Sequence, residues 1–251
     1  MVIRLTKKVI GIPIDPISWE NALDKLNIWA SRNESRYVCI CNVHSVVTAT
    51  QDAEFGRVVF EADMVTPDGA PVAWMLRHLG HRGQQRINGP DLMWRYCDQV
   101  QSRTESVFFY GNTEVTLSKL KLKLLDNFPN LKIAGTISPP FHALTPEEDD
   151  CIVNHINASG ASVVFVSLGC PKQELWMAAH RGRINAVMIG VGAAFDYHAD
   201  TIKRAPKWMQ NSGFEWLYRL LSEPRRLWKR YLVTNTLFIV LATKQLIFGI
   251  Q

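Results

Sequence analysis

Short, unbroken apolar runs alternate with helical patterns between about residues 105 and 196, and this alternation limits the folds open to the chain. The runs are SVFFYGN, LKIAGT, ASVVFVSLG and AVMIGVG, and a helical segment separates each from the next. A strand that is apolar at every position is covered on both faces, as strands of parallel sheets are. The order of segments therefore predicts an α/β fold with a mostly parallel sheet and helices on both faces.

The preceding part of the chain continues the alternation. Strands are predicted at KVIGIPI and YVCICN, and a short strand and turn at ADMVTPDGA. Helices are predicted over Ile17–Ala30, around His44–Phe60, from Pro71 to Leu79 and over GPDLMWRYCDQV. Further along, Thr145 followed by Pro146 predicts the start of another helix, because threonine caps and proline is accepted in the first turn.

Composition excludes a disordered chain and gives no sign of a metal site. Of 251 residues, 47% are hydrophobic and 20% are charged, which allows a sizeable core. The five cysteines are odd in number and show no CxxC spacing. They are therefore expected to be reduced thiols in a cytosolic protein, and no zinc site is predicted.

The C-terminal part of the chain concentrates positive charge and aromatic rings. Residues 203–230 contain eight basic and two acidic side chains, a net +6, so the remainder is close to neutral against a total of +5. Leucine and aromatic residues fall on one helical stripe, and Pro224 is expected to divide two helices. We therefore predict a Rossmann-like domain over residues 1–200 and a basic, amphipathic helical appendage over 201–251.

Three interpretations of the appendage compete: a nucleic-acid patch, a structural helix pair and a membrane-surface helix. Apolar and aromatic side chains on one side with Lys and Arg on the other favour the membrane surface. The last apolar run is long enough to span a bilayer, but Asn235, Lys244 and Gln245 interrupt it. The appendage is therefore expected to lie on the membrane and not to cross it.

Polar residues follow several of the predicted strands, where open α/β sheets bind ligands. Gly111 and Asn112 form a strand-to-helix turn that suits a diphosphate, although an ordinary tight turn looks the same. Gln173 lies in the first turn of the helix after GCP, where it could contact a sugar or phosphate or simply belong to a capped helix. Asp196 ends GVGAAFD and could accept from ribose hydroxyls or cap the next segment.

A second group of polar residues surrounds TPDGAP. Asp68, between Pro67 and Gly69, is a rigidly held carboxylate that could deprotonate a hydroxyl, or a plain turn aspartate. The nearby RINGPD offers Arg86 and Asn88 beside the start of a helix.

Six stretches together carry a resemblance to a known family: TPDGAPVAWMLRHLG, RINGPDLM, FFYGN, SLGCPKQELWMA, GVGAAFDYHADTIKRAPKWMQ and GFEWLYRLLSEPRRLWKRYL. In this order they resemble the WecG/TagA/CpsF glycosyltransferases of bacterial cell-envelope polysaccharide synthesis, over about residues 37–232. The resemblance implies an inverting, metal-independent transferase with a Rossmann-like sheet and no cofactor. Such an enzyme moves a hexosyl, N-acetylhexosaminyl or uronosyl group from a UDP-sugar to a sugar on a polyprenyl-diphosphate lipid.

The resemblance also assigns roles and a location. It makes Asp68 the general base and Asp196 a nucleotide-side acid, and it matches Asn42, Arg86 and Gln173 to polar active-site positions. The residues expected at the donor are Asn42, Gly111, Asn112, Gln173 and Asp196. The residues expected at the acceptor or diphosphate are Arg86, Asn88, Arg219, Arg225, Arg226 and Arg230. The enzyme is expected at the cytoplasmic face of the inner membrane as a peripheral protein.

Two functions of other classes remain open from the sequence. One is a non-catalytic peripheral membrane module, which should ignore UDP. The other is a nucleic-acid binder using the Arg and Trp surface, whose affinity should fall steeply with salt. The transferase is favoured, with a UDP-sugar, a lipid-linked acceptor and the membrane as partners and no nucleic acid. A homo-oligomer, with the tail packed on a neighbour, is also left open.

Overall fold

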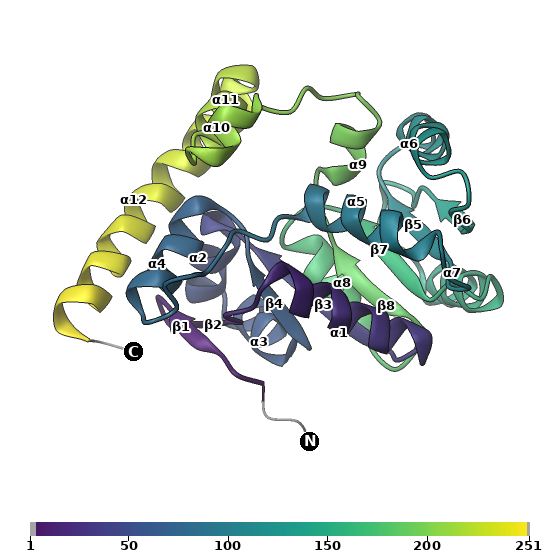
Figure 1. Cartoon of the computed structure of the whole chain (residues 1–251), viewed down its shortest axis with the longest axis horizontal. Coiled ribbons are helices and arrows are strands. Elements are labelled where there is room, and N and C mark those ends of the chain that lie inside the picture. The colour runs from purple at the N-terminus through teal and green to yellow at the C-terminus, as the bar shows by residue number, and fades with distance from the viewer. Residues whose placement is uncertain (1–3, 250–251) are drawn as a thin grey trace. The chain divides into compact units, whose positions relative to one another are not determined.

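The computed structural model describes residues 4–249 and has the alternating strands and helices expected from the sequence (Figure 1). Residues 1–3 and 250–251, which belong to the predicted domains 1–200 and 201–251, lie outside the described residues. The strands are β1 (Lys7–Val9), β2 (Ile12–Ile14), β3 (Arg36–Cys41), β4 (Met64–Pro67), β5 (Val107–Gly111), β6 (Ile133–Ile137), β7 (Val163–Ser167) and β8 (Val187–Gly190).

The helices between and after these strands fall into an early, a middle and a C-terminal set. The early set is α1 (Trp19–Ser31), α2 (Val43–Gln51), α3 (Ala53–Glu61), α4 (Ala70–His78) and α5 (Gly89–Val100). The middle set is α6 (Glu114–Asn127), α7 (Pro146–Ala158), α8 (Lys172–His180) and α9 (Ala194–His198). The C-terminal set is α10 (Lys207–Asn211), α11 (Glu215–Ser222) and α12 (Pro224–Phe248).

The central sheet has the strand order β4-β3-β8-β7-β5-β6, and the pairs β3–β8, β8–β7, β7–β5 and β5–β6 are parallel. Strands β5, β7 and β8 are buried at every position, because helices cover both faces of the sheet. The predicted α/β fold with a parallel sheet and a C-terminal helical segment is confirmed.

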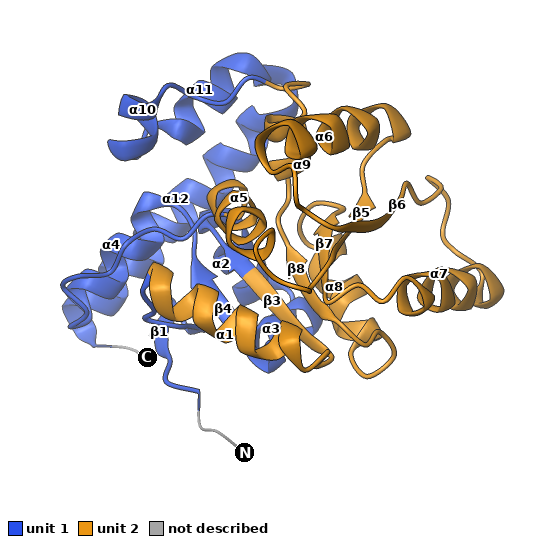
Figure 2. Cartoon of the chain, turned by 45° about the vertical axis from the view of Figure 1, so that its right-hand side comes forward, with its two compact units in different colours: residues 1–18, 40–88, 203–251 blue, residues 19–39, 89–202 orange. Residues whose placement is uncertain are grey.

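The chain forms two compact units, coloured separately in Figure 2. Unit 1 comprises residues 1–18, 40–88 and 203–251, and unit 2 comprises residues 19–39 and 89–202. Strand β3 belongs to both, since the division falls between Cys39 and Ile40. The predicted domains, 1–200 and 201–251, follow a different division and stay a prediction.

Local signals in the sequence explain several helix ends. Thr145 caps α7, because its hydroxyl accepts from the N–H of Glu148 and the Glu148 carboxylate accepts from the N–H of Thr145. The predicted break at Pro224 is confirmed, because α11 ends at Ser222 and α12 begins at Pro224. These ends are decided by residues within a few positions of each other.

Two predicted elements differ from the structure. The strand predicted at KVIGIPI is a hairpin, in which Ile10 and Gly11 both have positive φ and reverse the chain between β1 and β2. The helix predicted around His44–Phe60 is two helices, because Asp52 caps α3 by accepting from the N–H groups of Glu54 and Phe55.

Helix α12 packs one of its faces against the rest of unit 1 and leaves another exposed. Its buried residues are Leu227, Thr234, Phe238, Ala242 and Gln245, and it packs on α2. Gln245 accepts from the N–H of Ile10 at 2.8 Å and donates to the carbonyl of Lys8 at 2.7 Å, which fixes α12 to the hairpin. The polar Gln245 therefore makes buried bonds inside unit 1.

Candidate functional site

Asp68 lies in a turn that backbone hydrogen bonds fix within unit 1. Its N–H donates to the carbonyl of Cys41, the last residue of β3, at 2.9 Å. The N–H of Gly69 donates to Asp68 Oδ1 at 2.6 Å. Gly69 has a φ of +80°, which favours glycine, and a Cβ there would lie 3.7 Å from Asn42 Cβ. The turn therefore places Gly69 beside Asn42 and bonds the Asp68 backbone to the end of β3.

Asn42 has a structural role beside its predicted one. Its Oδ1 accepts from the N–H of Ser45 at 3.2 Å and so caps α2, as the extended backbone of Asn42 allows. Within residues 4–249, its Nδ2 donates no hydrogen bond. The cap fixes the carbonyl side of the amide, and the predicted contact of Asn42 with a donor sugar nucleotide stays a prediction.

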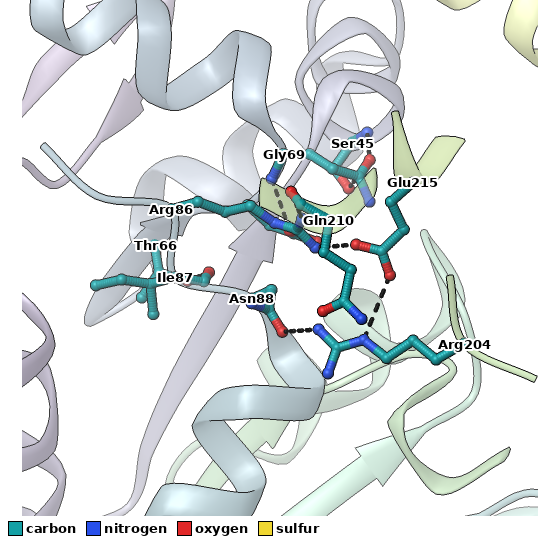
Figure 3. A network of polar contacts seen from close by, with 11 residues as sticks. Ser45, Thr66, Gly69, Arg86, Ile87, Asn88, Arg204, Gln210 and Glu215 are labelled. Atoms are coloured by element: carbon teal, nitrogen blue, oxygen red, sulfur yellow. Dashed lines mark hydrogen bonds and ion pairs between the residues drawn. The ribbon is translucent and has the colours of Figure 1, made fainter. Parts of the chain in front are cut away.

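Arg86 joins the Asp68 turn to the C-terminal segment (Figure 3). Its Nε donates to Asp68 Oδ1 at 3.1 Å, and its Nη2 forms a short ion pair with Glu215 Oε2. The backbone that carries Arg86 is held beside β4, because the N–H of Ile87 donates to the carbonyl of Pro67 at 2.9 Å. One guanidinium is thus shared between two carboxylates.

Arg204 completes this group on the other side of Glu215. Its Nε lies 3.5 Å from Glu215 Oε1, and its Nη2 donates to Asn88 Oδ1 at 3.1 Å. We call Asp68, Arg86, Asn88, Arg204 and Glu215 the base cluster. The base cluster thus contains two carboxyl groups and two guanidinium groups.

The surroundings of Asp68 raise its pKa. Burial is the largest cause, the Arg86 guanidinium opposes it, and the nearby Glu215 carboxylate adds to it. For Arg86, burial by itself would lower the pKa, but Asp68 and Glu215 outweigh it and hold the pKa above its ordinary value. Asp68 is therefore more basic than an exposed aspartate, while Arg86 stays charged.

The tail arginines differ in their surroundings. Arg219 and Arg230 are half-buried, whereas Arg225 and Arg226 are exposed, and Arg226 pairs with Glu223 at 2.7 Å. Arg230 lies over the ring of Tyr231 at 5.4 Å. Since positive charge is what a diphosphate needs, the predicted role of these four arginines is compatible with their placement and stays a prediction.

The expected donor residues of unit 2 form a second group. Asn112 Nδ2 donates to Asp196 Oδ2 at 2.9 Å, and Thr201 Oγ1 donates to Asp196 Oδ1 at 3.0 Å. We call Asn112, Asp196 and Thr201 the carboxamide cluster. The structure thus brings together two side chains, Asn112 and Asp196, that the sequence assigned separately to the donor.

Gly111 is explained by strand packing without any ligand. A Cβ on Gly111 would lie 2.5 Å from the carbonyl oxygen of Ser167, its partner on β7, and φ is +114°. No larger residue fits there unless the strands move apart. Its predicted contact with a diphosphate stays a prediction.

Gln173 and Glu174 are both buried at the start of α8. Gln173 Oε1 accepts from the N–H of Gly192 at 3.1 Å, and its Nε2 donates to Glu174 Oε1 at 2.9 Å. Burial raises the pKa of Glu174 to about 7, although the Gln173 amide and the Cys170 thiol oppose it. Gln173 therefore braces the loop after β8, which is a structural role alongside the predicted donor contact.

Sequence reasoning did not assign Glu215, Arg204, Glu174 or His44 to a site. Glu215 had a usable signal, because it is one of only two acids in a segment with eight cations. Burial, and then Arg230, lower the pKa of His44 to about 4, so this imidazole is neutral at pH 7. His44 lies in the first turn of α2, two residues after Asn42.

Two further observations concern ions and membranes. Residues 4–249 contain no group of three or more His, Cys, Asp or Glu side chains that could hold a metal ion. One described helix, α12, is long and apolar enough to cross a bilayer by length and composition, with a mean hydropathy of 1.4 over an 18-residue window.

Comparison with known proteins gives two matches. The profile of the glycosyl transferase WecG/TagA/CpsF family matches residues 7–251. A protein of Bacillus spizizenii named N-acetylglucosaminyldiphosphoundecaprenol N-acetyl-beta-D-mannosaminyltransferase is 30% identical over 205 residues, which are 81% of this chain and 77% of the relative. Both matches agree with the resemblance carried by the six motifs.

Proposed function

Because the chain belongs to the WecG/TagA/CpsF family of glycosyl transferases, we propose that it moves a sugar, with inversion, from a UDP-sugar to a sugar on a polyprenyl-diphosphate lipid. The Bacillus spizizenii relative is named for an N-acetylmannosaminyl group and a diphosphoundecaprenol-linked N-acetylglucosamine. N-acetylmannosamine is therefore the first donor sugar to test, before its uronic acid and glucose.

The observation that carries the mechanism is the state of the Asp68 carboxylate. The two hydrogen bonds that it accepts, from Gly69 and Arg86, both go to Oδ1. Within residues 4–249, Oδ2 accepts none. A side chain fixed through one oxygen and open at the other, with a raised pKa, suits a general base.

The reaction is a single displacement. Asp68 takes the proton of the acceptor hydroxyl while the hydroxyl oxygen forms a bond to the anomeric carbon of the donor sugar. The bond from that carbon to the β-phosphate oxygen breaks, and UDP leaves with the electron pair. Attack opposite the leaving group inverts the anomeric configuration.

The departing UDP and the acceptor diphosphate both need cations. The tail supplies four guanidinium groups, those of Arg219, Arg225, Arg226 and Arg230. In this proposal, these groups neutralise diphosphate charge, and Asn112 and Asp196 bind the nucleoside. No step in the proposal is assigned to a metal ion.

The exposed face of α12 supports peripheral binding to the membrane. Its large apolar side chains recur at helical spacing in two rows, Trp228, Leu232, Ile239 and Leu246, and Val233, Val240 and Ile247. The opposite face is bonded to the hairpin through Gln245. A helix held to its own protein on one side and apolar on the other suits a bilayer surface. We propose that this surface is the cytoplasmic face of the inner membrane.

The test of the mechanism is Asp68→Asn, which keeps the shape of the side chain and removes the base. We expect turnover to fall about 100- to 10,000-fold, since a general base contributes about 10²–10⁴, while UDP affinity stays within about twofold. Turnover is measured with a panel of UDP-sugars and a polyprenyl-diphosphate acceptor, and affinity by calorimetry. Turnover like that of the wild type would remove Asp68 from the mechanism.

The same UDP titration separates the other functions. A membrane module without catalysis would bind vesicles but not UDP. A nucleic-acid binder would bind oligonucleotides with an affinity that falls steeply with salt and would need no lipid. Binding of UDP together with lipid-dependent turnover is the result expected here.

A further inference from the structure

Glu215 is a carboxylate in a cationic segment, and it contacts the arginine that holds the expected base. We propose that Glu215 is a positioning residue for the transfer reaction, sharing the Arg86 guanidinium with Asp68 so that Asp68 remains able to take a proton. The inference rests on the proposed function, because it needs Asp68 to be the base.

The geometry divides the Arg86 guanidinium between two carboxylates. Its Nε faces Asp68 at 3.1 Å and its Nη2 faces Glu215. The third donor, Nη1, lies 3.5 Å from the carbonyl oxygen of Gln210. All three nitrogens thus have partners, two of them in residues 210–215, and the side chain is only 20% exposed.

If Arg86 were paired with Asp68 alone, Asp68 would be a weaker base. A cation within about 4–6 Å lowers the pKa of a carboxylate by about 1–3 units. Glu215 offsets this by placing a second negative charge against the same guanidinium. Because Asp68 retains a raised pKa, burial and Glu215 together outweigh Arg86.

Arg204 contacts Glu215 from the other side. It lies 3.5 Å from Glu215 Oε1 and is itself held by Asn88. Within residues 4–249, the charged and polar groups that act on the Asp68 carboxylate are Arg86, Glu215 and the N–H of Gly69. Arg204 contacts Glu215 and is not one of these groups. Glu215 begins α11, so the basicity of Asp68 depends on α11 being in place.

A purely structural role is the competing explanation. Glu215 could serve only to attach α11 to the segment that carries Arg86. Loss of such an attachment would lower activity at every pH by the same factor. Loss of the shared ion pair would instead move the pH at which activity appears, because it changes the proton affinity of Asp68.

The experiment is the pH dependence of kcat/KM for the full-length enzyme and for Glu215→Gln, with a UDP-sugar and a lipid-diphosphate acceptor. The acid limb reports the pKa of the essential base in the free enzyme. For Glu215→Gln we expect it about one pH unit lower, with a plateau reduced about threefold or more by the weaker base. Glu215→Asp retains the charge, and its limb should lie within about 0.3 units of the wild type.

A matched control exists on α7. Arg183 also bridges two carboxylates, Asp149 at 2.7 Å and Asp150 at 2.7 Å, and Asp150 is exposed. Asp150→Asn therefore removes one of two partners from an arginine outside both clusters. Its pH profile should coincide with that of the wild type.

Three results would overturn the inference. The first is an acid limb of kcat/KM that is unchanged in Glu215→Gln. The second is an acid limb displaced equally in Glu215→Gln and Glu215→Asp. If Glu215→Gln has no turnover, the titration of the Asp68 carboxyl is followed by ¹³C NMR instead. Its signal is assigned as the one that Asp68→Asn lacks. An unchanged titration midpoint in Glu215→Gln is the third result that would overturn the inference. Failure of the proposed function would be seen separately, because it would appear as full activity of Asp68→Asn with Glu215 unchanged.

Discussion

Replacing Glu174 by Gln should stabilise the protein at neutral and alkaline pH but not at acid pH. Glu174 is fully buried, and burial raises its pKa to about 7 from an ordinary value of 4.5. The unfolded chain therefore ionises this group above about pH 4.5, whereas the folded protein retains the proton to about pH 7. The stability that goes with the protonated form is fully present below pH 4.5 and is lost as the pH rises through 7.

The size of the effect follows from these two values. They differ by about 2.5 pH units, and each unit corresponds to about 1.36 kcal/mol, so about 3 kcal/mol is lost between pH 4.5 and 8. The amide of the Glu174→Gln variant would resemble the protonated acid at every pH and would escape this loss. For a chain of this length, about 3 kcal/mol corresponds to about 6–12 °C in Tm.

The assay is urea unfolding, followed by circular dichroism at several values between pH 4 and 8, for the wild type and Glu174→Gln. The quantity of interest is how the difference in unfolding free energy changes with pH, since any fixed effect of the amide cancels. Glu114→Gln, at an exposed first-turn position of α6, is the control and should show no comparable change. A difference between wild type and Glu174→Gln that does not vary with pH would refute the reasoning.

The remaining predictions concern single positions. Gly111→Ala should cost about 3 kcal/mol or more of unfolding free energy, because the new Cβ would meet a backbone carbonyl. Gly160 also has a positive φ but lies in open space, so Gly160→Ala should cost only about 1 kcal/mol. Equal losses in the two variants would contradict this explanation. Asp196→Asn should weaken UDP binding about tenfold by calorimetry, with the exposed Asp200→Asn unchanged; normal affinity would exclude Asp196 from the nucleotide site. Ile239→Glu, on the exposed face of α12, should abolish flotation with anionic liposomes without lowering Tm, and continued flotation would place the membrane contact elsewhere.

Truncation before Gly213 is a less selective test of the tail. It should cost both activity and liposome binding, but it also removes Glu215 from the base cluster and α12 from α2. The point substitution on α12 separates membrane contact from both of these losses.

Several features of the fold were predictable because their causes are local. The buried strands β5 and β7 are continuous apolar runs, and the ends of α7 and α12 are marked by Thr145 and Pro224. Hydrophobic periodicity, helix caps and proline act over a few residues, so the local sequence is enough to predict these strands and helix ends. The hairpin at Ile10–Gly11 was missed because a non-glycine residue there adopts positive φ, which sequence preference disfavours.

The sequence by itself determined the parallel α/β sheet, the family and the residue types available for transfer chemistry. Only the tertiary structure decided which of them meet: Arg86 and Glu215 are 129 positions apart, and Asn112 and Asp196 are 84 apart. It also decided that Gln245 is buried against the hairpin while the opposite face of α12 is exposed. Ion pairs and burial depend on distances in space, which the spacing of residues along the chain does not fix.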